Sequence, residues 1–81
     1  MSAHANDAPA PTIPPGRYVH YKGQEYLVLG VARHTETEEW LVVYQALYGA
    51  RGLWVRPATM FSSAVEVGGK SVPRFSFVGP E

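Results

Sequence analysis

The sequence of 81 residues contains no cysteine, which excludes disulfides, thiolate nucleophiles and zinc sites that depend on Cys ligands. It also lacks an excess of either charge, since seven Lys and Arg balance seven Asp and Glu. This balance argues against a general nucleic-acid binder, which carries a basic surface. No apolar run approaches the roughly 18 residues that a membrane-spanning helix needs. The absence of cysteine is typical of a cytoplasmic protein, and we expect that location.

A chain of this length predicts one small domain with one core, and a groove rather than a deep pocket as its ligand site. The first fifteen residues are rich in Ala and Pro, carry no Lys or Arg, and lack the apolar segment of a secretion signal. We therefore expect a disordered leader over residues 1–15 and a single β-barrel domain over residues 16–81.

After the leader, short apolar and β-branched segments alternate with turns that contain glycine. This pattern predicts strands at residues 17–21, 24–34, 40–48, 53–56 and 74–78, and a hairpin at residues 65–72 around Gly68-Gly69. If Lys22 and Gly23 form a tight turn, His20 lies opposite Glu25 as a favourable cross-strand pair.

The second and third of these strands are apolar on both faces. Along residues 24–34, unbroken alternation places Leu27, Leu29 and Val31 on one face and Tyr26, Val28, Gly30, Ala32 and His34 on the other. The next strand places Trp40, Val42, Tyr44, Ala46 and Tyr48 on one face. A strand buried on two sides, or one bent around a small barrel, explains this pattern. Gly30 favours the second explanation, because glycine within a strand marks bends and bulges.

Pro57 favours the start of a helix, and the segment after it is long enough for one or two helical turns. We expect these turns to direct Met60 and Phe61 toward the core. The fold class that follows is all-β. We predict a small SH3-like barrel of five to six short antiparallel strands, with one short helical turn near residues 58–63.

Five motifs in the sequence carry a family resemblance: H-Y-K-G, A-R-H-T-E-T, V-V-Y-Q-A-L-Y, L-W-V-R-P-A-T-M-F and R-F. With these motifs, the chain from about Gly16 to Val78 resembles the bacterial domain-of-unknown-function family numbered sixteen fifty-three. Thr35 stands where Ser is common in that family, which keeps the hydroxyl. The resemblance implies a small β-barrel domain and brings no activity, cofactor or partner with it.

The charged segment Arg33–Trp40 separates two of the most apolar segments of the chain. Residues 35–38 match a capping box, in which a Thr hydroxyl and a Glu carboxylate satisfy free backbone N–H groups, so a capped turn between strands explains the segment. Alternatively, His34 ends a strand face beside open space and lines a polar and aromatic cleft with Tyr44 and a Glu.

The sequence gives little support for catalysis or metal binding at this segment. His34 and Glu36 are the minimum for acid–base catalysis, but no Ser or Cys lies beside them as a nucleophile. A metal site from His20, His34 and Glu36 matches no compact ligand spacing. The sequence therefore assigns no catalytic residue, no metal ligand and no cofactor.

Trp54 and Arg56 share one face of a predicted strand. In one interpretation Trp54 covers the end of the barrel and Arg56 pairs with Glu36, Glu38 or Glu39. In the other, Arg56 is a fixed guanidinium beside an aromatic surface, which suits a carboxylate, a phosphate or a stacked base. The second interpretation gives a candidate ligand site of Arg33, His34, Glu36, Tyr44, Trp54, Arg56 and Arg74.

We interpret the protein as a binding module, not an enzyme, for an anionic or aromatic ligand: a nucleotide, an RNA segment or an acidic peptide. The alternative is a protein–protein interaction or homo-oligomerisation domain in which the same aromatic residues contact another chain. A small acid–base enzyme that uses His34 and Glu36 is the third interpretation.

Overall fold

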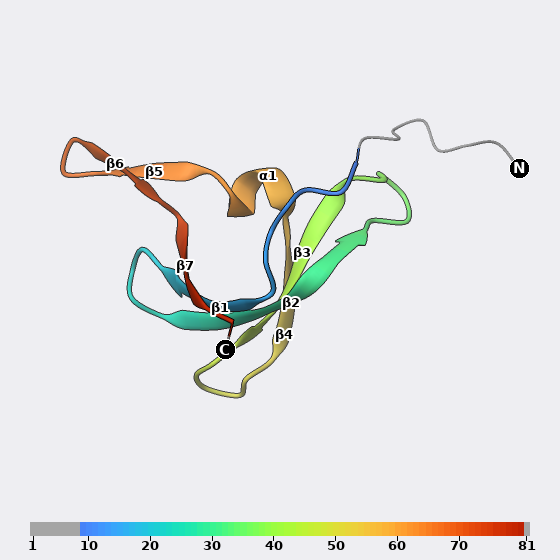
Figure 1. The fold of residues 1–81 in the computed structure, drawn as a ribbon, viewed down its shortest axis with the longest axis horizontal. Coiled ribbons are helices and arrows are strands. Elements are labelled where there is room, and N and C mark those ends of the chain that lie inside the picture. Colours follow the sequence, from blue (N-terminus) through green and yellow to red (C-terminus); the bar gives the residue numbers. More distant parts are fainter. Residues whose placement is uncertain (1–8, 81) are drawn as a thin grey trace, which may run out of the picture.

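The computed structural model describes residues 9–80, which form seven strands and one helical turn (Figure 1). In chain order these are β1 (Gly16–His20), β2 (Glu25–Arg33), β3 (Trp40–Ala46), β4 (Leu53–Pro57), α1 (Ala58–Phe61), β5 (Ala64–Val67), β6 (Lys70–Pro73) and β7 (Phe75–Gly79). The all-β class is confirmed, with one strand more than predicted and a helix that ends two residues earlier.

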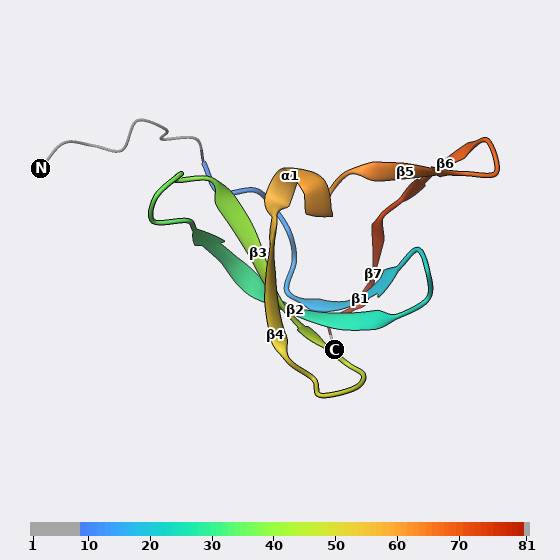
Figure 2. The same cartoon turned by 180° about the vertical axis from the view of Figure 1, so that it is seen from behind.

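Five strands form one antiparallel sheet in the order β4-β3-β2-β1-β7, and β5 and β6 form a separate hairpin. Figures 1 and 2 show that the large sheet is strongly curved and that the hairpin projects away from it. Within residues 9–80 the edge strands β4 and β7 do not pair with each other, so the sheet is an open, barrel-like structure. The SH3-like assignment stays a prediction.

The core lies on one face of this sheet, where α1 packs against β3 and β4. Phe61 of α1 stacks on Phe75 of β7 with ring centroids 4.2 Å apart, and its ring meets that of Tyr18 edge-on. Val28 and Val42 are the most completely buried large side chains of the described residues. These contacts define the inner face of the sheet, and the opposite face is its outer face.

A β-bulge in β2 changes which side chains reach the inner face. The register with β3 shifts between Val28 and Gly30, so Val28 is buried, Leu29 is exposed and Val31 packs against the core. The predicted alternation is therefore wrong beyond Val28, because a bulge sets two residues against one and reverses the faces that follow. The register shift lies beside Gly30, the residue that favoured a bent strand.

Two smaller expectations are also wrong. Glu25 lies opposite Val19 instead of His20, and it forms an ion pair of 3.1 Å with Arg17. Met60 is exposed, whereas Phe61 is buried. A helix of one turn presents only one face to the core, and here Ala58 and Phe61, three positions apart, occupy that face.

The described part of the predicted leader runs along the body of the protein. Ile13 packs against the core, and the Tyr18 hydroxyl donates a hydrogen bond of 2.7 Å to the carbonyl oxygen of Pro14. The rest of that prediction, residues 1–8, lies outside the described residues. In the part that the structure describes, no helix has the length and apolar character needed to cross a membrane.

Candidate functional site

A small cleft opens on the inner face where β2, β3 and β4 lie side by side. Its volume is about 170 Å³, and it is lined by Tyr26, Tyr44, Tyr48, Trp54 and Arg56. The β3–β4 register sets Tyr44 opposite Trp54, and strand alternation brings Arg56 to the same face. We call this site the aromatic cleft.

Tyr26 is the centre of the aromatic contacts in this cleft. Its ring meets those of Tyr44 and Tyr48 nearly perpendicularly, at centroid distances of 5.2 and 5.6 Å. The hydroxyls of Tyr26 and Tyr48 share a hydrogen bond of 2.9 Å. Burial and, to a smaller extent, this hydrogen bond raise the pKa of Tyr26 to about 12. The Tyr26 hydroxyl in the wall of the cleft is therefore neutral at physiological pH.

Arg56 supplies the positive charge of the aromatic cleft. Its Nε donates a hydrogen bond of 3.4 Å to the Tyr44 hydroxyl, and its guanidinium lies 5.4 Å from the ring centroid of Phe75. Among residues 9–80 it forms no ion pair, so the expected pairing with a Glu of residues 36–39 is wrong. A guanidinium held by a hydroxyl and a ring keeps most of its donors for a ligand.

His20 connects the aromatic cleft to two further cations. Its ring lies edge-on to Phe75 at 4.9 Å, and its Nδ1 accepts a hydrogen bond of 3.2 Å from the backbone N–H of Lys22. Partial burial lowers the pKa of His20, and the nearby charges of Arg56, Lys22 and Arg74 lower it further. The charges of three cations therefore act on one imidazole.

Arg74, the last of these cations, is also held by a hydroxyl. Its Nε donates a hydrogen bond of 3.1 Å to Ser63 Oγ, and its backbone N–H bonds to the Ser63 carbonyl. The backbone oxygen of Arg74 accepts a hydrogen bond from Tyr21, next to His20. The backbone thus fixes Arg74 beside the strand that carries His20.

Three of the seven predicted site residues meet in the aromatic cleft, namely Tyr44, Trp54 and Arg56. Arg74 joins them on the same side of the molecule, within the electrostatic reach of His20. The other three, Arg33, His34 and Glu36, lie at the far end of β2, which Figure 1 shows opposite the turn between β1 and β2. The candidate site therefore divides into two separate regions.

At that far end, His34 holds the turn together. Its Nδ1 accepts hydrogen bonds from the backbone N–H groups of Glu36 and Thr37, at 3.0 and 3.2 Å. The predicted turn between two core strands is confirmed, but the imidazole of His34 takes the capping role that the sequence gave to the Thr35 hydroxyl. Glu36, Glu38 and Glu39 gather acidic charge on this turn.

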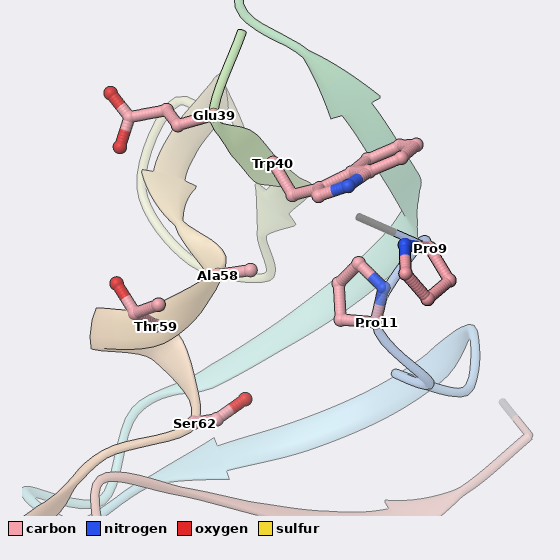
Figure 3. A pocket seen from close by; sticks show the side chains of 7 residues that line it. All are labelled: Pro9, Pro11, Glu39, Trp40, Ala58, Thr59 and Ser62. Carbon is pink, nitrogen blue, oxygen red and sulfur yellow. The ribbon is translucent and has the colours of Figure 1, made fainter. Parts of the chain in front are cut away.

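A larger apolar pocket lies beside this turn. Its volume is about 410 Å³, and Figure 3 shows its walls: Trp40 with Pro9 and Pro11 on one side, and Ala58, Thr59 and Ser62 on the other. Glu39 stands at its rim with the carboxylate turned away from the prolines (Figure 3). Arg33 lies over the Trp40 ring at 4.5 Å. The pocket offers mainly apolar contact, whereas the aromatic cleft combines rings with a charge that orients a ligand, so we regard the cleft as the candidate site.

Sequence reasoning did not identify His20 and Tyr26 as residues of this site. It placed Tyr26 in one row with Gly30 and His34, which directed attention to the other end of β2. The signal that could have separated them is Gly30 itself, because a bulge there ends the row that Tyr26 begins.

No group of three His, Cys, Asp or Glu side chains within residues 9–80 is arranged to hold a metal ion. The set of His20, His34 and Glu36 is not assembled, since His20 and His34 lie beyond opposite ends of β2.

Comparisons with known proteins place the chain in context. A family model described as a protein of unknown function (DUF1653) matches residues 16–77. A crystal structure of a protein of that family from Bordetella bronchiseptica is similar to this chain, with 43% sequence identity and a TM-score of 0.77, and the match covers 83% of this chain and 88% of the other. No curated protein matches the sequence.

Proposed function

We propose that this chain, which belongs to the family of proteins of unknown function DUF1653, binds a nucleotide-like ligand in its aromatic cleft. A negatively charged group of the ligand binds Arg56, and an aromatic ring of the ligand stacks on Trp54. The protein acts as a binding module, without catalysis.

One observation carries this proposal. Arg56 and Arg74 are fixed by hydroxyl groups, and within residues 9–80 neither forms an ion pair with a carboxylate. The described acidic residue nearest to this end of β2, Glu25, is already paired with Arg17. The positive charge around His20 is therefore uncompensated, and an anionic ligand would supply the missing partner.

The shape of the cleft indicates how much of the ligand it receives. A volume of about 170 Å³ suits a single phosphate, carboxylate or ring, and the rest of the ligand would lie outside. Trp54 is largely exposed, and so is Tyr48, so both offer ring faces for a stacked base. Stacking on an aromatic ring is worth about 1–3 kcal/mol per base, which is enough to add specificity to a charge contact.

An RNA segment would use the same two contacts, and an acidic peptide would use the charge contact alone. The net charge of zero favours a short ligand over a long polynucleotide, whose affinity depends on many phosphate contacts. We therefore propose a mononucleotide as the minimal ligand.

The experiment is an NMR titration of the labelled protein with adenosine monophosphate, and in parallel with adenosine, inorganic phosphate and a short glutamate-rich peptide. We expect adenosine monophosphate to shift the backbone signals of Tyr26, Tyr48 and Trp54 in a saturable way. Adenosine keeps only the stacking contact with Trp54, and phosphate keeps only the charge contact with Arg56. Each is therefore expected to bind at least about tenfold more weakly than adenosine monophosphate.

Variants test the two contacts separately. Arg56→Ala is expected to weaken binding about tenfold or more, and Arg56→Lys, which keeps the charge and loses the planar fork, to weaken it less. Trp54→Leu is expected to abolish the preference for adenosine monophosphate over phosphate. Lys70→Gln on the projecting hairpin and His34→Ala in the acidic turn are controls that should leave affinity unchanged.

Two results would contradict the proposal. One is saturable binding whose shifts lie around Trp40 and Ala58 instead of the aromatic cleft. The other is an equal affinity of wild-type protein and folded Arg56→Lys and Arg56→Ala variants. Binding of the glutamate-rich peptide alone would replace the nucleotide by an acidic peptide as the ligand of the same cleft.

A further inference from the structure

The edge strand β4 exposes three consecutive apolar side chains. Leu53, Trp54 and Val55 are 65%, 60% and 58% exposed, although each lies within a regular strand. Figure 2 shows β4 running from the turn at the bottom of the molecule up to α1. An exposed apolar strand at the edge of a sheet is a template for pairing with another chain.

The backbone of β4 has a free row of hydrogen-bonding groups. Ala46 donates its N–H to the carbonyl of Gly52, and bonded pairs alternate along an antiparallel ladder. Trp54 and Arg56 therefore bond to β3, while the N–H and C=O groups of Leu53 and Val55 point away from it. Pro57 lies in the same free row, where its missing N–H costs the β3–β4 ladder nothing.

The other edge of the sheet, β7, is less suited to pairing. Its register with β1 shifts between Arg17 and Tyr18, which twists the strand, whereas β4 pairs with β3 at five consecutive positions without a shift. β4 has no bulge, Lys or Glu, and of the two residues in it that can protect an edge, Arg56 and Pro57, only Pro57 at its end lies in the row that faces away from β3.

We propose that β4 pairs with β4 of a second copy of this chain, antiparallel and about a two-fold axis at Val55, which joins the two sheets into one. In this register Val55 faces Val55 of the other copy, and Leu53 faces Pro57. Each Leu53 N–H bonds to the Pro57 carbonyl of the other copy, and the two Val55 residues exchange both of their bonds. Pro57 accepts the bond from Leu53 but has no N–H to return, so the carbonyl oxygen of each Leu53 is left to water.

The same register is self-complementary in its side chains. Trp54 of one copy faces Arg56 of the other on the inner face, in a non-bonded pair where side chains approach most closely. A ring against a guanidinium is a favourable contact, and the two-fold axis repeats it. This pairing favours a second copy over an unrelated extended peptide, and it brings Trp54 of each copy to the aromatic cleft of the other.

Sedimentation velocity of the full chain from about 5 to 500 μM tests the pairing. An edge contact buries less than the about 1,600 Å² of a standard interface, so we expect a dimer that dissociates in the micromolar range. Val55→Lys places two like charges on the axis and should give a monomer at all these concentrations. Val78→Lys, at an exposed position of the other edge strand, is the matched control and should still dimerise.

Charge reversal tests the register itself. Val55→Glu should also be monomeric, and a mixture of Val55→Lys with Val55→Glu should dimerise again, because only a two-fold axis at residue 55 brings these side chains together. Wild-type protein that stays monomeric to about 500 μM, a dimer that survives in Val55→Lys, or a mixture that stays monomeric would overturn the proposal. These measurements contain no ligand, so they test the pairing separately from ligand binding at the aromatic cleft, which uses the same Trp54 and Arg56.

Discussion

At the scale of single residues, Gly16 occupies the most restricted position of the described backbone. Its φ is +140°, a region that L-residues rarely adopt, and a Cβ there would collide with the carbonyl oxygen of Gly79. Gly16 therefore permits the close approach by which β7 joins the edge of β1. Gly30, in the bulge of β2, differs, since a Cβ there would meet open space and its φ is not positive.

We predict that Gly16→Ala lowers the free energy of unfolding by about 2 kcal/mol or more, because the new methyl group must displace backbone and the conformation is strained. Gly30→Ala is the control, and its unfolding free energy should stay within about 0.5 kcal/mol of wild type. Urea denaturation of both variants checks this. Equal stabilities of the two variants would show that the β1–β7 approach is not tight.

Residue types alone predicted Tyr44, Trp54 and Arg56 correctly as neighbours, because regular alternation holds along β3 and β4. They did not predict what His34 does. A histidine next to a capping-box pattern has two uses, as a turn acceptor or as a site residue, and only the orientation of its ring distinguishes them. That orientation depends on tertiary structure, which the local sequence does not contain.

At the scale of elements, the bulge in β2 decides which end of the strand carries which side chains. The fold class and most strand positions followed from hydrophobic period and glycine turns. Gly30 favoured a bent strand, but the effect of the bulge was not predicted: it reverses every face after Val28 and moves Arg33 to the side of Trp40. A single extra residue thus separates Tyr26 from His34, which unbroken alternation had placed on one face of β2.

The hairpin β5–β6 is the element with the least support. It pairs with no other strand in the described chain, and Val65 and Val72 are its only half-buried apolar pair. Two bonds between Arg74 and Ser63 close its base. An isolated two-stranded hairpin is only marginally stable, so this element should open without unfolding the large sheet.

We predict that amide hydrogen exchange distinguishes the two sheets. Amides of residues 65–72 should exchange by local opening, at least about a hundredfold faster than the bonded amides of β2 and β3. Ser63→Ala, which removes the acceptor of Arg74, should accelerate exchange in the hairpin and leave β2 and β3 unchanged. Uniform protection of both sheets would show that the hairpin unfolds only with the whole protein.

At the scale of the whole molecule, His20 makes stability depend on pH. Burial and three nearby cations hold its pKa below the usual 6.5 in the folded state. Below pH 6.5 the unfolded chain therefore binds a proton more readily than the folded protein does. The contribution of His20 is fully present above pH 6.5 and is lost as the pH falls through this window.

We predict that the unfolding free energy of wild-type protein decreases from about pH 6.5 to pH 5, and that His20→Asn decreases less over the same range. Asn keeps an acceptor for the Lys22 N–H but does not titrate. Urea denaturation at several pH values measures both curves. Parallel curves would assign the pH dependence to other groups.

The separation of the acidic turn from the cationic end of the sheet has a consequence for approach at long range. Glu36, Glu38 and Glu39 follow the last residue of β2, whereas Lys22 precedes its first residue and the carbonyl oxygen of Arg74 accepts a hydrogen bond from Tyr21 beside that end. Nine strand residues span about 27 Å. A net charge of zero thus conceals a permanent electric dipole along β2. Near a negatively charged surface, this dipole turns the cationic end forward before any atom makes contact.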